Sequence, residues 1–287
     1  MHSEAFIRSV FFFGIFLAMA LWEVLAPRRR LTVGKWGRWG NNLGIIFLDT
    51  LMVRVLMPMA AINTALAAQQ SGWGLLHSFQ VSQGLAMVIG VLFLDMIIYL
   101  QHLMFHSVPL LWRLHMVHHA DLDIDLTTGL RFHPIEILIS MGIKIAAVAV
   151  IGPPVAAVLA FEVILNGTAM FNHGNVYMPK GLDRVLRLLV VTPDMHRVHH
   201  SVTIRETNSN FGFNFPWWDR IFGTYRAQPV AGHDGMKIGI AQFRDRKLVT
   251  FPRLLLLPFI GYPGSYAINK SGMEPVKTGK ERSKRAS

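Results

Sequence analysis

Long hydrophobic blocks separated by short polar stretches fill the chain up to about residue 171. The first block, residues 5–26, has the length that a helix needs to cross a lipid bilayer. No cluster of positive charges precedes it, and Trp22 and Glu23 do not fit a cleavage site, so we interpret it as a retained helix and not as a signal peptide. The pattern therefore predicts a membrane anchor at the start of the sequence.

Four further apolar blocks follow. The second, residues 43–68, contains Arg54 and Pro58, which predict a helix that is bent or partly interfacial. The third, residues 84–101, predicts a spanning helix that carries the chain back to its first side. The last two are short blocks joined by Gly-Pro-Pro, residues 135–151 and 155–171, and they fit either two crossings or a deep hairpin. Both alternatives return the chain to the side that it left.

Beyond Tyr177 the sequence is mostly polar, which predicts a cap outside the bilayer with one interfacial stretch, "FPRLLLLPFIGY". The chain has 287 residues, of which 52% are hydrophobic and 16% charged, and no linker divides it. We predict an all-α integral membrane protein with four to five embedded helical segments and a helical cap. Its single domain would comprise anchor helices (1–84), a catalytic core (85–227) and a tail (228–287).

The net charge of +11 is concentrated toward the end of the chain, since eighteen of the 28 Lys and Arg lie from Lys180 onward. The end "KTGKERSKRAS" and the loop "PRRRLTVGKWGRWG" are also basic, and such segments of membrane proteins face the cytoplasm. This predicts a multi-pass protein of the bacterial inner membrane or, in a eukaryote, the endoplasmic reticulum, with its cap in the cytoplasm. No nucleic-acid motif accompanies the charge, which argues against a nucleic-acid partner.

The chemistry is concentrated in histidines. There are thirteen histidines and no cysteine, so thiolate sites are excluded and any metal must be bound by nitrogen and oxygen. Eight of the histidines form three groups whose spacing places the rings of each group on one face of a helix. These groups are His102 and His106; His115, His118 and His119; and His196, His199 and His200.

All three groups are predicted on the same side of the membrane, because an even number of crossings separates them. Eight or more imidazoles exceed the ligands of one ion, so we predict two metals. Imidazole suits iron, copper and zinc, and the ligand type does not choose among them. His173 follows the fifth apolar block and is positioned to join the site, whereas His133 is equally consistent with a ligand, an orienting residue or a structural hydrogen bond. We expect His2, His77 and His233 at the surface.

Several polar residues near the motifs are candidates for orienting the metal ligands or binding metal themselves. They are Glu136, Asp194, Asn208 and Asp219. We expect the three acids after the first HxxHH motif to cap helices or to lie in solvated loops: Asp121, Asp123 and Asp125. The acids inside apolar blocks, Asp95 and Glu162, are expected to face the interior of the bundle. The tryptophan pair, Trp217 and Trp218, is expected to anchor the cap at the membrane interface.

The succession of motifs resembles the membrane fatty acid hydroxylase superfamily, which includes sterol desaturases. The motifs, spread over residues 85–227, are "QHLMFH", "LHMVHH", "RFHPIE", "FNHGN", "TPDMHRVHHS", "NSNFGF" and "WWDRIFGTY". The version "TTGLRFHPIE" is similar to the alkylglycerol monooxygenase branch. The resemblance implies a non-haem centre of two iron ions on the cytoplasmic side, which activates dioxygen to oxidise a C–H bond of a lipid or sterol. The implied ligands are His102, His106, His115, His118, His119, His173, His196, His199 and His200.

Neither a flavin site nor a nicotinamide site is visible, because no GxGxxG follows a strand. Electrons would therefore come from an external donor, or from a pterin if the alkylglycerol branch applies. The alternative function is a histidine-rich membrane metal transporter, which would distribute histidines over both faces. A zinc protease is disfavoured because Leu103 stands where HExxH requires its glutamate. Hydroxylation and desaturation remain alternatives at this point.

Overall fold

The computed structural model describes residues 2–57 and 61–270, and these ranges are entirely helical apart from turns and loops. Within them, strand-like pairing is limited to two isolated bridges, Pro27 with Val176 and Ser201 with Ile238. The predicted all-α class is confirmed. Pro58, the basic end "KTGKERSKRAS" and the side chain of His2 lie outside the described residues.

Five helical segments of the described chain are long and apolar enough to cross a membrane, in agreement with the predicted blocks. One of them is divided, because α2 ends at Leu56 and α3 begins at Ala61, where an irregular helix was predicted. The segments are α1 (His2–Leu25), α2 (Lys35–Leu56) with α3 (Ala61–Ser71) and α4 (Leu75–Ser78), α5 (Gln83–Ser107), α7 (Pro134–Ile151) and α8 (Val155–Asn172).

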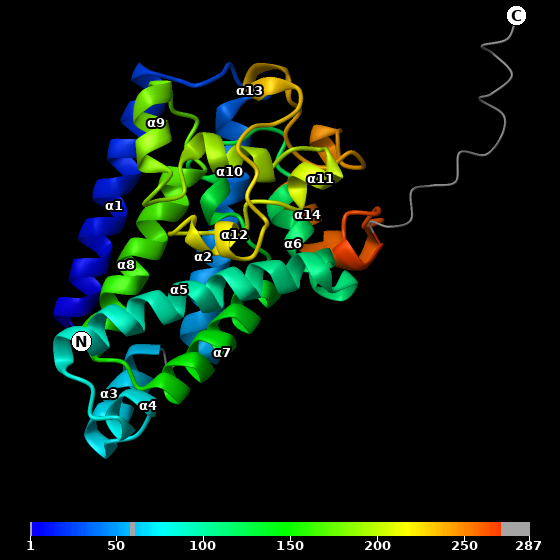
Figure 1. Ribbon diagram of the computed structural model, residues 1–287. Coiled ribbons are helices and arrows are strands. Elements are labelled where there is room, and N and C mark those ends of the chain that lie inside the picture. Colours follow the sequence, from blue (N-terminus) through cyan, green and yellow to red (C-terminus); the bar gives the residue numbers. More distant parts are fainter. Residues whose placement is uncertain (1, 58–60, 271–287) are drawn as a thin grey trace, which may run out of the picture.

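A tight turn joins α7 to α8. Gly152 closes α7 in the left-handed conformation at φ 63°, and a Cβ added there would meet Trp73 O at 2.5 Å. Pro153 and Pro154 follow and cannot continue α7, so a new helix begins at Val155. Helix α5 contacts both α7 and α8, while α1 packs along α8 (Figure 1). The turn therefore returns the chain to the side where His173 ends α8.

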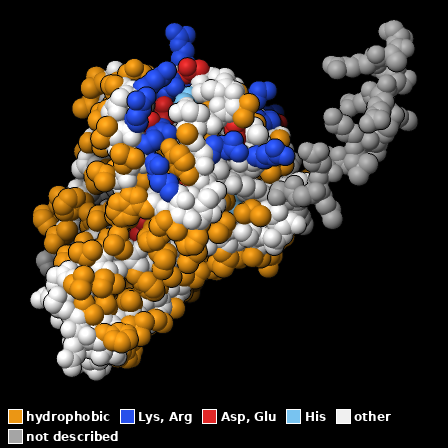
Figure 2. All heavy atoms as spheres, in the orientation of Figure 1, with side chains coloured by type: hydrophobic (Ala, Val, Ile, Leu, Met, Phe, Trp, Pro, Cys, Tyr) orange, Lys and Arg blue, Asp and Glu red, His pale blue; other side chains and the backbone are white. Residues whose placement is uncertain are grey.

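Short helices form a cap at the opposite end of the molecule from α3 and α4 (Figure 1). Figure 2 shows Lys and Arg gathered on this end and hydrophobic side chains over most of the rest of that face. The cap and its neighbours comprise α6 (Pro109–His119), α9 (Lys180–Leu186), α10 (Pro193–His199), α11 (Ile204–Thr207), α12 (Trp217–Ile221), α13 (Gly232–Gly235) and α14 (Phe251–Ile260), with 3-10 turns at Thr128–Leu130, Arg246–Val249 and Ile268–Lys270.

The apolar helix α14 has two different faces. Leu254 and Leu257 are buried in a core that includes Trp112 and Met116 of α6, whereas Leu256, Phe259 and Ile260 are exposed. An outward apolar face is what a helix lying on a membrane surface requires. The interfacial position of this stretch stays a prediction.

The acids inside the apolar helices face the interior, as predicted. Asp95 is buried on α5, and Glu162 is buried on α8, where it pairs with Lys144 of α7. The indole N–H of Trp218 donates to Asp95 Oδ2 at 2.7 Å and so fixes the cap on α5, while the predicted anchoring of the tryptophan pair at the membrane interface stays a prediction. Trp217 likewise donates to Leu188 O at 2.7 Å. Both indoles are half-buried and hydrogen bonded within the protein.

Candidate metal centre

Four helices bring the predicted histidines to one place beneath the cap. A single residue, Val108, separates α5 from α6, and Pro109 starts the new helix, so the end of α5 and the length of α6 lie against each other. Pro193 starts α10 in the same way. The rings come from α5 (His102, His106), α6 (His115, His118, His119), the C-cap of α8 (His173), and α10 with its C-cap (His196, His199, His200).

The nine histidines form two compact groups, and all nine are buried. In each group, one nitrogen from every ring lies within 4.8 Å of the others. The first group has five members, His102, His106, His115, His119 and His199; the second has four, His118, His173, His196 and His200. The two HxxHH motifs are thus each divided between the groups.

Backbone carbonyls fix the orientation of four rings. A carbonyl oxygen only accepts hydrogen bonds, so each Nδ1 must carry the proton and each Nε2 must present its lone pair. The pairs are His102 with Phe211 O (2.8 Å), His118 with Arg131 O (3.1 Å), His173 with Ala169 O (2.7 Å) and His199 with Ser209 O (2.7 Å).

Two predicted orienting residues act in the same manner through their side chains. His106 Nδ1 lies 3.0 Å from Asn208 Oδ1, and the Asn208 amide donates to Tyr266 O at 2.8 Å, which leaves its oxygen to accept from the imidazole. His115 Nδ1 lies 2.6 Å from Glu136 Oε1. Such outer partners hold a ring in the tautomer that coordinates metal. Asn208 and Glu136 are therefore placed to orient the ligands.

Several inward nitrogens face other ring nitrogens that carry no proton. The Nε2 atoms of His102 and His115 are 3.1 Å apart, and so are those of His118 and His173. With all four protons on Nδ1, these contacts set lone pair against lone pair and cannot be hydrogen bonds. In the described part of the chain, both ring nitrogens of His119 and His200 also lack a partner. A donor set of neutral imidazoles around two points fits two nitrogen-ligated metal ions.

Burial keeps these imidazoles neutral. Desolvation lowers the pKa of His115 and of His173 to about 3. The same cause lowers the pKa of the other cap-side histidines of the site well below its usual value, namely His118, His119, His196, His199 and His200. Neutral imidazole is the form that binds metal, so the site requires no proton release near pH 7.

Three other predicted candidates lie outside the two groups. His133 caps α7, where Nδ1 accepts from Ile135 N at 3.2 Å and Nε2 lies 3.2 Å from Leu255 O, so its contacts are structural hydrogen bonds. Asp194 pairs with Arg197 and Arg28 and contacts none of the nine histidines. Asp219 accepts from the backbone N–H of Phe211 (2.7 Å) and of Gly212. It therefore influences His102 only through the loop that carries Phe211 O.

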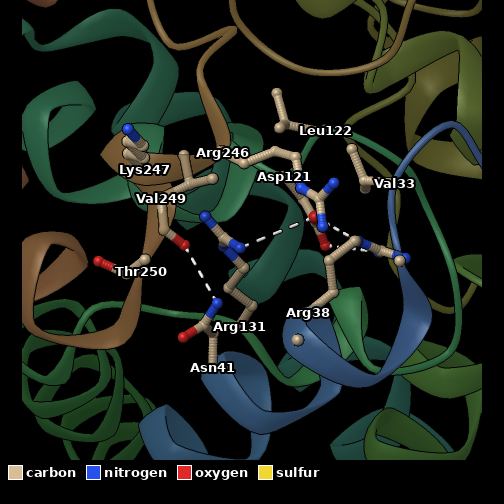
Figure 3. Close-up of a pocket in the computed structure, with 12 residues that line it drawn as sticks. Val33, Arg38, Asn41, Asp121, Leu122, Arg131, Arg246, Lys247, Val249 and Thr250 are labelled. Atoms are coloured by element: carbon tan, nitrogen blue, oxygen red, sulfur yellow. Dashed lines mark hydrogen bonds and ion pairs between the residues drawn. The ribbon is translucent and has the colours of Figure 1, made fainter.

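The expectation that the acids after the first HxxHH motif cap helices or lie in solvated loops is wrong. Asp121, Asp123 and Asp125 are all buried. Arg38 donates to Asp121 through Nε and Nη2, both at 2.7 Å (Figure 3). It also donates to Asp125 at 2.6 Å. Asp123 accepts from Thr32 N at 2.6 Å. These acids attach the first turn of α2, and the loop before it, to the loop after α6.

Arg131 connects this ionic network to the metal ligands. Its carbonyl accepts from His118, its Nε donates to Val117 O at 2.8 Å, and its Nη1 lies 3.7 Å from Asp121 Oδ1 (Figure 3). Sequence reasoning missed Arg131 and counted Arg38 only as part of a basic loop. The available signal was the regular Asp-x-Asp-x-Asp pattern beside a ligand motif, because three acids so close to an apolar core require cationic partners.

The surface assignment of His233 is also corrected. His233 is buried in the cap, and its Nε2 lies 3.6 Å from Asp194 Oδ2. Desolvation lowers its pKa to about 4. His77, by contrast, is half-buried on α4 at the far end of the molecule, and it is the better control for substitutions in the metal centre.

A cavity of about 670 Å³ leads to one of the two groups. It lies among α2, α5, α7 and α8, and the metal-centre histidines that line it, His102 and His115, both belong to the group of five. Phe105, Phe132 and Phe213 form part of its wall. A substrate in this cavity would meet the five-histidine group first.

The hydrogen bond between Asn208 and His106 gives a direct test of ligand orientation. We expect Asn208→Leu to lower metal affinity about 10–100-fold, because His106 loses the acceptor that fixes its ring. Asn208→Asp retains an acceptor and should remain within a few-fold of the wild type. Competition with a chelator, followed by metal analysis, measures both. Equal affinities for Asn208→Leu and the wild type would contradict the orienting role.

Comparisons with known proteins give relatives of one kind. Residues 87–224 match the model of the fatty acid hydroxylase family. The chain is 27% identical over 221 residues to the ornithine lipid hydroxylase OlsE of Rhizobium tropici, an alignment that covers 74% of this chain and 64% of OlsE. It is 33% identical over 128 residues to human alkylglycerol monooxygenase, covering 44% of this chain and 27% of that enzyme.

A third relative is human cholesterol 25-hydroxylase, which is 28% identical over 146 residues, covering 49% of this chain and 51% of the enzyme. The chain thus spans less than two thirds of the length of each of these relatives. No solved structure matches the chain. The matched segment contains all nine histidines of the two groups.

Proposed function

We propose that the chain is a membrane-bound oxidoreductase that uses dioxygen to hydroxylate a C–H bond of a lipid. The match of residues 87–224 to the fatty acid hydroxylase family supports this proposal. The observation that carries the proposal is the pair of buried histidine groups, whose inward nitrogens oppose one another without protons between them. A cation at each group would satisfy that arrangement.

The metal that we propose is iron, one ion in each group. His102, His106, His115, His119 and His199 would bind the first ion, and His118, His173, His196 and His200 the second. Two bound iron ions would supply dioxygen activation and removal of a hydrogen atom from the substrate. In support, each of the three relatives is named as a hydroxylase or monooxygenase, which favours hydroxylation over desaturation.

The protein's own contribution is to orient the imidazoles and to keep water away. Phe132 stacks on His118 with ring centroids 4.4 Å apart, and Phe211 packs against His106 at 5.0 Å. These rings cover the ligands on sides that no hydrogen bond uses. A dry surround protects a strong oxidant from side reactions.

The substrate that we propose is a membrane lipid that enters the cavity between α2, α5, α7 and α8. The named relatives act on ornithine lipid, alkylglycerol and cholesterol, which are all hydrophobic molecules with a polar end. A cavity of about 670 Å³ among membrane-spanning helices suits such a molecule. We assign anchor helices to residues 1–84, the catalytic core to 85–227 and the tail to 228–287.

We further propose that the cap faces the cytoplasm and receives electrons there from an external donor or a pterin. The basic residues gathered on the cap support this orientation (Figure 2). A metal transporter is less well supported, because nine of the thirteen histidines gather beneath the cap, and the described membrane helices carry no further histidine group that could hold a metal.

Isotope labelling tests the proposal. The protein, purified with iron and returned to bilayer nanodiscs with total membrane lipid and a chemical reductant, is exposed to ¹⁸O₂. We expect lipid products that gain one ¹⁸O atom, detected by mass spectrometry, and none without dioxygen or without reductant. Products that instead lose two hydrogens would identify a desaturase. Absence of any dioxygen-dependent product from iron-loaded protein would contradict the proposed function.

A further inference from the structure

Two acidic side chains face the cavity beside the metal centre with no cation between them. Asp49 of α2 and Glu136 of α7 both line it, and they are only 5% and 4% exposed. In the described part of the chain, Asp49 Oδ1 and Glu136 Oε2 are buried without a hydrogen-bond partner. Helix α2 packs against α7, so the two residues line the same cavity from neighbouring helices. Buried carboxyl oxygens without a partner are costly, which indicates that a donor from outside the chain completes the site.

The cationic side chains of the cavity do not complete it. Lys144 and Arg8 both pair with Glu162, and Lys144 lies two turns further along α7, about 12 Å from Glu136 at 1.5 Å per residue. Arg54 is exposed, and no ion pair between it and Asp49 occurs among the described residues. The two acidic side chains therefore face the cavity without a cationic side chain paired to them among the described residues.

Glu136 also places this acidic site next to the proposed metal centre. Its Oε1 accepts from Nδ1 of His115, a member of the five-histidine group that lines the cavity, while Oε2 remains free. The neighbouring wall is hydrophobic, with Ile46, Phe105 and Ile137. A ligand that matches both features carries a compact cation with several donors attached to hydrophobic chains.

We propose that Asp49 and Glu136 bind the ammonium group of a lipid whose polar head carries a primary amine, so that carbons near this nitrogen face the metal centre. A primary ammonium has three N–H donors and a single charge, which suits one unpaired oxygen from each carboxylate. The inference rests on the proposed function and specifies its substrate class. It follows that oxygen enters the head group and not the distal acyl chain.

Binding of a matched lipid pair tests this inference. One probe is a two-chain lipid with a free primary amine in its head, and the other is the same lipid with that amine N-acetylated and therefore neutral. Affinities are measured for iron-loaded protein in detergent micelles, for the wild type, Asp49→Asn and Asp234→Asn. Asp234 is a suitable control because its side chain is 80% exposed on the cap and lies outside the cavity.

We expect the wild type and Asp234→Asn to bind the amine lipid at least about tenfold more tightly than its acetylated form, because a buried charge pair is lost on acetylation. In Asp49→Asn this ratio should fall close to one. Asp49→Asn replaces a buried acidic group that lacks a partner for one oxygen, so its lipid-free melting temperature should equal or exceed that of the wild type. Equal affinities of the wild type for both lipids, or a ratio that survives in Asp49→Asn, would overturn the inference.

Metal content and product analysis on the same samples separate this inference from the proposed function. Dioxygen-dependent oxidation without any preference for the amine lipid overturns the inference alone. A clear amine preference in protein that binds no metal and oxidises nothing overturns the proposed function. Fragmentation spectra locate the added oxygen, and its presence in the distal acyl chain would contradict the placement of the head group.

Discussion

Replacing His119 with alanine should remove both metal binding at the five-histidine group and nearly all lipid oxidation. His119 is buried in the centre of that group, and neither of its ring nitrogens has another partner in the described structure. Substitution of a residue that only hydrogen-bonds to a metal ligand typically lowers metal affinity about 10–100-fold, so the loss of a ligand itself should lower it by more. We expect bound metal to fall to half of the wild-type value or less, and turnover to fall at least about 100-fold.

The stability of His119→Ala should depend on the metal. In metal-free protein the substitution removes two buried polar atoms that lack partners, so the melting temperature should stay unchanged or rise. In metal-loaded protein it should fall, because a ligand bond is lost. His77→Gln, at the far end of the molecule, should change neither metal content nor turnover. If His119→Ala destabilised both forms equally and kept its metal, the imidazole would be a packing residue and not a ligand.

Arg38→Met is expected to cause the largest loss of stability in the protein. Arg38 is buried and donates to both Asp121 and Asp125, and no other cation lies within 3.5 Å of either acid in the described chain. Removing one partner from a buried ion network leaves uncompensated charge and costs about 3–5 kcal/mol. Because Arg131 links this network to His118, metal affinity should fall as well.

Denaturant titration in detergent measures the change in the free energy of unfolding. Arg246→Met is the matched control, since Arg246 is exposed at the cavity of about 280 Å³ that borders the same network (Figure 3). Adding Asp121→Asn to Arg38→Met should restore part of the lost stability, because it removes one of the stranded charges. An Arg38→Met protein as stable as Arg246→Met would show that the network contributes nothing to the fold.

Hydropathy was sufficient to predict the membrane-embedded helices. The predicted block 84–101 became α5, and blocks 135–151 and 155–171 became α7 and α8 almost to the residue. Such long apolar segments admit only helices in a bilayer, so little else competes with the prediction. The prediction that the histidine motifs lie at one end of the molecule also needed only the number of apolar segments between them. That number can be counted in the sequence without knowledge of how the helices pack.

The roles of some residues near the motifs depend on contacts with residues distant in the sequence, and these roles could not be predicted. His133 lies in one of the motifs that carry the family resemblance, yet it caps α7, because its ring meets Ile135 N and Leu255 O. Asp121 follows a ligand motif in what reads as a polar loop, yet it is buried because Arg38, 83 positions earlier, reaches it. Local spacing carries no information on partners so distant in the chain.

The division of the ligands between two groups was equally invisible in one dimension. Adjacent histidines such as His118 and His119 point to different groups, and His199 and His200 do the same. On a helix, neighbouring positions differ by about 100° in direction, so this separation follows from helical geometry only once the position of the partner helix is known. The number of histidines in the motifs predicted two metal ions, and the fold gathers these histidines into two groups.

Metal stoichiometry tests the central claim most directly. Wild-type protein expressed with iron, purified without chelators and shown to be folded is analysed by mass spectrometry of its metals against quantitative amino-acid analysis. We expect two iron ions per chain, one for each histidine group. Folded protein that binds no transition metal, or that saturates at one ion per chain, would contradict it.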